Sequence, residues 1–259
     1  MKVIVCASKQ ALGEQAAREG SARIREALRL RGEANVIIAS GTSQLEMLDN
    51  LVTAEGIDWH RVTGFHLDEY VGLPITHPAS FRLYMWDRFV RRLPLPLRAF
   101  HYIDADHDGG DPPTPGPAGR DPEAERRRLG AILAQHPVDV AFAGIGENGH
   151  LAFNEPPADF ETEEPYLLVA LSEISRRQQV GEGWFASVDD VPRQAISMSV
   201  RQMMKSAAIV CCAPEQRKAV AVRAVVTGPV TPEVPASILQ SHPQATLYLD
   251  PASASLLGG

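Results

Sequence analysis

One segment of the sequence combines closely spaced glycines with acid–base side chains. It runs from residue 144 to 156 and reads GIGENGHLAFNEP. Glycines allow a tight turn and a close approach of the backbone to a ligand. Histidine is the side chain that titrates near neutral pH, so His150 can supply an acid–base group, and Glu155 is a carboxylate that can orient it. The G-x-G-x-x-G spacing is only a weak dinucleotide signal, and a histidine and then Asn-Glu-Pro follow it here instead of a helix. The segment therefore predicts acid–base chemistry.

A second group of titratable side chains lies in residues 64–72, GFHLDEYVG. His66, Asp68, Glu69 and Tyr70 come directly after a strand-like run, at the position where sheet proteins gather the ionisable groups of an active site. The same residues fit a polar loop in which Asp68 caps a turn. From the local sequence the two interpretations are equally good.

A third candidate segment is a turn of small residues, Ser40, Gly41 and Thr42, before a helical pattern over residues 44–51. The free N–H groups and the dipole at the start of a helix bind phosphate well. Ordinary capping of the helix by Thr42 or Ser43 is the more common explanation of such a turn. The turn alone therefore leaves a phosphate site as the less favoured interpretation.

The acidic and histidine side chains of these segments could also be combined into a metal site. None forms a helix-spaced pair such as H-E-x-x-H, and the cysteines lie elsewhere, at positions 6, 211 and 212. Neighbouring residues of a strand point to opposite faces, so Cys211 and Cys212 are badly placed to bridge each other. We therefore expect no metal and three reduced, buried cysteines.

Short apolar runs alternate with helix-like stretches and predict the elements that position these side chains. Residues 12–30 have apolar or small residues at helical spacing, which predicts an amphipathic helix. The runs that predict buried strands are 3–5, 35–38, 61–65, 138–142, 208–211 and 245–249. The repeated order implies a Rossmann-like α/β fold, with a doubly wound, mainly parallel sheet and helices on both faces. Ligands bind such sheets at the carboxyl ends of the strands, where the three candidate segments lie.

Length and composition are those of a globular protein. The 259 residues are 44% hydrophobic and 22% charged, and we expect a single domain over residues 1–259. The net charge of −7 argues against a nucleic-acid partner, although local cations can still bind a small anion. The N-terminal apolar run is too short for a signal peptide or a membrane span, so we expect a cytoplasmic location and no membrane partner. Residues 104–120, rich in Pro, Gly and Asp, predict a surface loop.

Three longer strings, in order along the chain, make a family resemblance specific. They are LDEYVGLP with HPASF at 67–81, GIG through GHLAFNEP at 144–156, and PASILQ before HP at 235–243. Together they resemble the glucosamine-6-phosphate deaminase/isomerase family over residues 35–250. The 6-phosphogluconolactonases share the fold and a related Gly-His loop, but the DEYVG and FNEP strings resemble the deaminase branch.

The resemblance implies an activity on an amino-sugar phosphate: ring opening, proton transfer between C2 and C1, and loss of ammonia, as from glucosamine 6-phosphate to fructose 6-phosphate. It makes Asp68 the proton-transfer carboxylate, His150 the ring-opening histidine and Glu155 the carboxylate that tunes it. One carboxylate can carry a proton between adjacent carbons, and hemiacetal opening suits a group that titrates near neutrality. A carboxylate beside the imidazole should raise its pKa. No redox cofactor is required.

The resemblance also implies how the phosphate of the substrate is bound. Ser40, Gly41 and Thr42 match the family's phosphate loop, and Lys218 matches its phosphate lysine. The family's phosphate arginine lies in a mobile lid, where Arg177 is the preferred match over the arginine before it.

The sequence departs from the family pattern at three places. Asn148, which we keep among the candidate catalytic residues, stands where some members carry a second acid beside the Gly-His pair. It should lower the pKa of His150 relative to an Asp-bearing site. The lid reads RQQVGEGWF at 177–185, unlike the usual deaminase lid, and His66 replaces a small amide. These differences bear on the exact substrate more than on the fold.

Two other functions are compatible with the same residues. A lactonase acting on a sugar-acid phosphate would use His150 to activate water, and a non-catalytic sugar-phosphate sensor would use the fold only to bind. The presence of Asp68, His150 and Glu155 together favours an enzyme over a sensor. A small-molecule sugar phosphate is the expected partner in each case, and a homo-oligomer is plausible.

Overall fold

A seven-stranded parallel sheet forms the centre of the protein, in a computed structural model that describes residues 1–105 and 121–258. The strand order is β1-β10-β9-β6-β2-β3-β5, and every neighbouring pair is parallel. The strands are β1 (Lys2–Val5), β2 (Ala34–Ile38), β3 (Val62–His66), β5 (Ala99–His101), β6 (Val140–Gly144), β9 (Ala208–Cys212) and β10 (Ala245–Leu249). All six predicted strands form. The edge strand β5 was not predicted, because three half-buried residues give too short an apolar signal.

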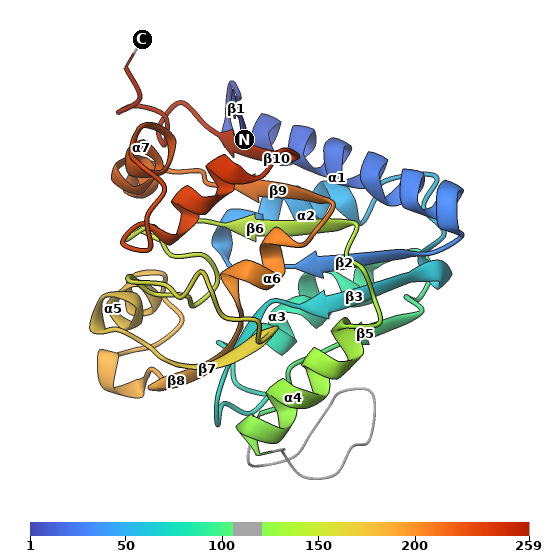
Figure 1. The fold of residues 1–259 in the computed structure, drawn as a ribbon, viewed down its shortest axis with the longest axis horizontal. Coiled ribbons are helices and arrows are strands. Elements are labelled where there is room, and N and C mark those ends of the chain that lie inside the picture. The colour runs from blue at the N-terminus through green and yellow to red at the C-terminus, as the bar shows by residue number, and fades with distance from the viewer. Residues whose placement is uncertain (106–120, 259) are drawn as a thin grey trace.

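Helices cover both faces of this sheet (Figure 1). One face packs against α1 (Lys9–Arg31), α2 (Leu45–Leu51) and α3 (Phe81–Arg88), and the other against α4 (Pro122–Leu133), α6 (Val200–Met204) and α7 (Ala219–Thr227). Successive side chains of a strand point to opposite faces of the sheet, and this divides the core into two parts. Val36 and Ile38 of β2 pack toward the first set of helices, and Ile37 packs toward the second set. The predicted doubly wound α/β fold is therefore confirmed.

The long helix α1 has clear signals at both ends. The Ser8 side chain accepts a hydrogen bond from the backbone N–H of Ala11 at 3.1 Å, which satisfies one free donor of the first turn. Gly32 ends the helix with a φ of 78°, a left-handed conformation that glycine adopts without strain. The helix predicted at 12–30 is confirmed with slightly wider bounds.

A second, smaller sheet lies beyond the C-terminal ends of the central strands (Figure 1). It is antiparallel, in the order β4-β8-β7, and consists of β4 (Asp68–Tyr70), β7 (Tyr166–Ala170) and β8 (Gln194–Met198), with α5 (Glu173–Gly181) between β7 and β8. Only Leu67 separates the end of β3 from the start of β4. The interpretation of this segment as a polar loop with Asp68 capping a turn is therefore wrong, because Asp68 pairs in a strand with Ser197, more than a hundred residues away.

The remaining elements are short 3-10 turns, and they connect the strands to the helices. They lie at Thr42–Gln44, Trp59–Arg61, Val90–Arg92, Val188–Asp190, Gln216–Lys218 and Pro235–Ser241. Of the predicted surface loop at 104–120, residues 106–120 lie outside the described part of the chain. Within the described residues, no helix is long and apolar enough to span a membrane.

Candidate active site

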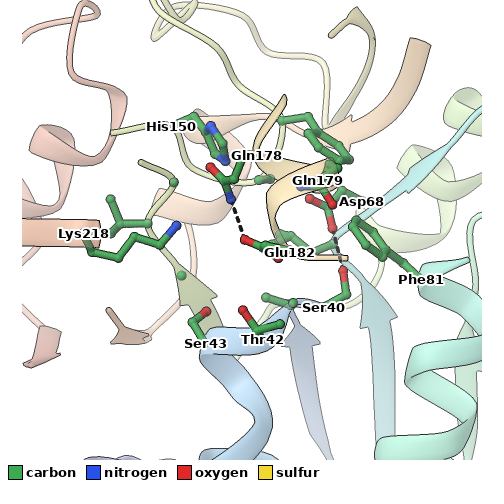
Figure 2. A pocket seen from close by; sticks show the side chains of 18 residues that line it. Ser40, Thr42, Ser43, Asp68, Phe81, His150, Gln178, Gln179, Glu182 and Lys218 are labelled. Atoms are coloured by element: carbon green, nitrogen blue, oxygen red, sulfur yellow. Dashed lines mark hydrogen bonds between the residues drawn. The ribbon is translucent and has the colours of Figure 1, made fainter. Parts of the chain in front are cut away.

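A cavity lies at the C-terminal ends of four neighbouring strands, β9, β6, β2 and β3. Each strand is followed by at least one candidate residue that lines the cavity: Lys218 follows β9, His150 follows β6, Ser40 follows β2 and Asp68 follows β3. The space between them opens to solvent, as in a cleft that binds a small molecule. Figure 2 shows these side chains converging on one space from different elements. The parallel sheet thus brings together residues that are up to 178 positions apart.

Asp68 is a buried carboxylate at the junction of the two sheets, with 6% of its surface exposed. One oxygen, Oδ1, accepts a hydrogen bond from the Ser40 hydroxyl at 3.2 Å (Figure 2). Burial raises the pKa of Asp68 from 3.8 to about 7, the Ser40 hydrogen bond opposes this rise, and the nearby charge of Glu69 adds to it. A carboxyl with a pKa near 7 can both take and return a proton at neutral pH.

Glu69, the next residue, fixes the strand that carries Asp68. Its carboxylate accepts the Ser80 hydroxyl at 3.0 Å and the backbone N–H groups of Phe81 at 3.2 Å and Arg82 at 2.7 Å. These donors belong to the N-terminus of α3, where a negative charge is favourable. Glu69 therefore ties β4 to α3 and faces away from the cavity that Asp68 lines.

His150 is held directly over a glycine of its own loop. A Cβ atom added at Gly146 would lie 2.2 Å from Nε2 of His150, so only glycine leaves room for the imidazole. Nδ1 of the ring is 3.3 Å from the Ser175 hydroxyl of α5 and 4.0 Å from Oε2 of Glu155. Burial lowers the pKa of His150 to about 4, and Glu155 opposes this only in part. The expected rise in the pKa of His150 is therefore outweighed by desolvation, and the imidazole is neutral at pH 7.

Asn148 bridges the histidine loop and Glu155. Its Oδ1 accepts the backbone N–H of His150 at 3.1 Å, and its Nδ2 donates to Oε2 of Glu155 at 2.9 Å. Neither Asn148 nor Glu155 lines the cavity, so the two are placed to position His150 rather than to touch a ligand. The other Glu155 oxygen, Oε1, is buried and has no hydrogen-bond partner within residues 1–105 and 121–258.

Ser40, Gly41 and Thr42 line the cavity beside Asp68, to which the Ser40 hydroxyl donates. Gly41 has a φ of 117°, a conformation that residues with a Cβ rarely adopt. Lys218 faces the loop across the cavity and is 3% exposed (Figure 2). Burial lowers the pKa of Lys218, and the charge of Glu182 opposes that change. One cation and a turn of backbone N–H groups suit a phosphate group.

Arg177 lies outside the cavity, which corrects its expected place beside a phosphate. Residues 175, 176 and 179 bury one side of α5, and this turns Arg177 to the solvent side, where its Nε donates to Glu173 at 2.9 Å. The side chain of Arg177 is 69% exposed. The neighbouring Arg176 is buried, and its guanidinium donates to the backbone oxygens of Val188 and Val191. Neither arginine reaches the cavity in this conformation.

Three polar side chains of α5 and its C-terminus line the cavity instead: Gln178, Gln179 and Glu182. The prediction of site residues missed them. Their signal was present in the lid string at 177–185, which differs from that of the resembling family, but the spacing alone does not show which side chains turn inward. Arg217 was also missed. It donates to Thr42 at 2.9 Å and to Glu182 at 2.8 Å, and so connects the phosphate loop with α5.

The described residues contain no group of three or more histidine, cysteine or carboxylate side chains that could hold a metal ion. The three cysteines are free and buried, and burial raises the pKa of the Cys6 and Cys211 thiols.

The fold and the cavity together define a doubly wound α/β protein that places two acid–base side chains in one cavity with a loop suited to an anion. The family of glucosamine-6-phosphate isomerases/6-phosphogluconolactonase matches residues 7–248. A glucosamine-6-phosphate deaminase from Lactobacillus delbrueckii subsp. bulgaricus is 36% identical over 99% of this chain and 100% of its own length. Another from Streptococcus equi subsp. equi is 35% identical over 88% of this chain and 89% of its own. The chain therefore belongs to this family, as the resemblance predicted.

Solved structures place it within the same fold. A monomeric glucosamine-6-phosphate deaminase is similar with a TM-score of 0.82 and 30% identity, over 99% of this chain and 100% of that one. A putative 6-phosphogluconolactonase from Neisseria gonorrhoeae has a TM-score of 0.72 and 16% identity, over 96% and 98% of the two chains. At that identity the lactonase shows a shared fold only.

Proposed function

We propose that this protein isomerises and deaminates an amino-sugar phosphate, converting glucosamine 6-phosphate and water to fructose 6-phosphate and ammonia. The observation that carries the proposal is the meeting of Asp68, with a pKa near 7, and a neutral His150 in one cavity with a phosphate-type loop. Relatives that bear this activity in their names match almost the whole chain. We assign the catalytic roles to Asp68 and His150.

Ring opening is assigned to His150. A neutral imidazole can accept the proton of the C1 hydroxyl and return it to the ring oxygen, which opens the hemiacetal to an aldehyde. Asn148 and Glu155 hold the histidine loop, and Ser175 contacts Nδ1, so that the ring has one orientation. The low pKa of His150 keeps it in the neutral form that accepts the first proton.

Proton transfer is assigned to Asp68. Its carboxylate removes the proton from C2 of the open chain while the ammonium group gives a proton to O1, which forms an enolamine, and Asp68 then returns its proton to C1. The resulting C2 iminium adds water and releases ammonia, leaving the ketose phosphate. Burial of Asp68 supports this role, because a desolvated carboxylate binds the proton more tightly and shields it from exchange with solvent.

The phosphate is assigned to the space between the turn of Ser40, Gly41 and Thr42 and the Lys218 side chain that faces this turn across the cavity. Arg177 would need α5 to rearrange before it could join them, since it now pairs with Glu173. The expected homo-oligomer and cytoplasmic location stay predictions, and one structural relative is described as monomeric.

The test is an assay of ammonia and ketose phosphate from glucosamine 6-phosphate, with Asp68→Asn as the active-site variant. The substitution keeps the size of the side chain and removes its base, so we expect turnover to fall by about a thousandfold or more. Asp58→Asn, at an exposed position before the 3-10 turn Trp59–Arg61, is the matched control and should keep full activity. Full turnover by Asp68→Asn would contradict the mechanism. Hydrolysis of a sugar-acid phosphate lactone without ammonia release would instead place the protein with the lactonases.

A further inference from the structure

The α5 side of the cavity carries polar groups that the proposed mechanism does not use. Gln179 and Glu182 are three residues apart, so they lie on the same side of this helical segment, and both line the cavity. Figure 2 shows Gln179 beside Asp68, and Glu182 between Asp68 and the Lys218 end. We call Gln179 and Glu182 the α5 wall.

Gln179 lines the cavity and has an unsatisfied hydrogen-bonding group. The residue is 5% exposed, and its Oε1 is buried without a partner in the described part of the chain. A buried polar atom left unpaired costs about 1–3 kcal/mol, so such atoms are usually completed by a ligand or by water. Because the amide has both a donor and an acceptor, it can bind a hydroxyl group in either orientation.

Glu182 is fixed in place by the protein rather than left free to leave the cavity. Its Oε1 accepts Arg217 at 2.8 Å and Gln178 at 2.9 Å, its Oε2 accepts the Trp184 indole N–H at 3.3 Å, and its side chain is 6% exposed. A carboxylate held in this way repels a phosphate but accepts hydrogen bonds from hydroxyl groups. Its position is therefore suited to the uncharged middle of a sugar phosphate.

We propose that the α5 wall binds the C3 and C4 hydroxyl groups of the sugar phosphate and determines which stereoisomer the protein accepts. This inference rests on the proposed function for the placement of the ligand. With the C6 phosphate at Ser40–Thr42 and C1 and C2 at Asp68, the C3 and C4 hydroxyl groups are those left to face α5. Epimers at C4 differ only in the direction of one of these hydroxyl groups.

The experiment measures binding of substrate analogues that cannot react, because they lack a carbonyl group. The probes are glucitol 6-phosphate, its C4 epimer galactitol 6-phosphate, the 3-deoxy and 4-deoxy analogues of glucitol 6-phosphate, and inorganic phosphate, which reports on the phosphate end alone. Calorimetry on the full chain gives the dissociation constants. We expect the wild-type protein to bind one epimer about tenfold or more tightly than the other. It should bind at least one deoxy analogue about tenfold more weakly than glucitol 6-phosphate, which corresponds to one lost hydrogen bond.

Two variants test the wall from the protein side. Gln179→Leu should weaken the preferred hexitol phosphate about tenfold, reduce the epimer preference to within about threefold, and leave inorganic phosphate unchanged. In Gln179→Leu, the deoxy analogue that lacks the hydroxyl group bound by Gln179 should bind no more weakly than the complete hexitol phosphate. Glu182→Gln should lower the affinity for the hexitol phosphate relative to that for inorganic phosphate by about tenfold. Gln135→Leu and Glu173→Gln, at exposed positions of α4's C-terminal end and of α5, are the matched controls.

The outcomes separate this inference from the proposed function. Equal binding of both epimers and of the deoxy analogues by the wild-type protein would overturn the α5 wall, even if ammonia release is observed. If Glu182→Gln tightens phosphate and hexitol phosphate equally, Glu182 competes with the phosphate and does not bind hydroxyl groups. Epimer-selective binding without ammonia release would refute the deaminase activity and leave the wall standing.

Discussion

Replacing Asp68 by Asn should make the protein more stable, and the gain should depend on pH. Burial holds the pKa of Asp68 at about 7, against an ordinary value of 3.8. The two pKa values differ by about 3, and a pKa difference of one corresponds to about 1.4 kcal/mol, so the free-energy difference is about 4 kcal/mol. This is the free energy that the folded protein loses when it must hold the ionised carboxylate, and an asparagine does not ionise.

Whether the stability difference between the wild type and the variant grows or shrinks with pH follows from which state of the protein, folded or unfolded, binds the proton of Asp68 more tightly. Below pH 3.8 the carboxyl is protonated in both the folded and the unfolded protein, so its charge has no effect on stability. Between pH 3.8 and about 7 the unfolded protein ionises first, and the stability of the wild type falls relative to the variant. Above about pH 7 both states are ionised, and the difference stays constant.

The assay is urea unfolding of the wild type and Asp68→Asn between pH 4 and pH 8, followed by fluorescence of the buried Trp59 and the other tryptophans. The free energy of unfolding of the variant minus that of the wild type should rise by about 4 kcal/mol over this range. Asp58→Asn, on the surface, should show no such rise. A difference that is independent of pH would show that Asp68 is not desolvated, and would also remove the physical basis of its role as a base with a pKa near 7.

Four further predictions concern the groups around the cavity. Gly146→Ala should lower kcat by about tenfold or more, since the added methyl group would overlap the His150 ring, while thermal unfolding should show a folded protein with a modestly lower Tm. Lys218→Ala should raise KM for the phosphorylated substrate about tenfold to a hundredfold in steady-state assays, whereas Arg177→Ala, exposed and outside the cavity, should change KM less than about twofold. Ser175→Ala should lower kcat about fivefold without changing KM, because it removes the hydroxyl 3.3 Å from His150 Nδ1; an unchanged kcat would exclude this contact from the mechanism. In the wild type, kcat/KM should rise with pH up to about 7 as Asp68 ionises, and a profile that falls over pH 5–7 would contradict that assignment.

The identity of the chemical groups could be predicted from the sequence because their loops follow strongly patterned strands. Val36–Ile38 and Val140–Phe142 are buried runs of apolar residues, and parallel strands end at one edge of a sheet. That rule alone predicts that Ser40, Asp68 and His150 share an edge. The glycine at 146 marks a close approach, which the His150 ring makes.

The small sheet and the α5 wall could not be predicted in the same way. Asp68 belongs to a three-residue strand whose partner is β8, and β8 comes from a segment more than a hundred residues later. Short strands whose pairing is non-local carry almost no periodic signal. Likewise, the direction of Arg177, Gln179 and Glu182 depends on which side of α5 is buried, and the helix has only nine residues.

The sequence by itself determined the elements and the types of reacting group, since strand patterning and loop composition are local properties of the chain. Only the tertiary structure decided the protonation state of those groups. A lone histidine beside a carboxylate suggests a raised pKa, yet the burial of His150 lowers it, and the burial of Asp68 raises its pKa to about 7. Desolvation depends on everything packed around a side chain, and that is set by segments distant in sequence.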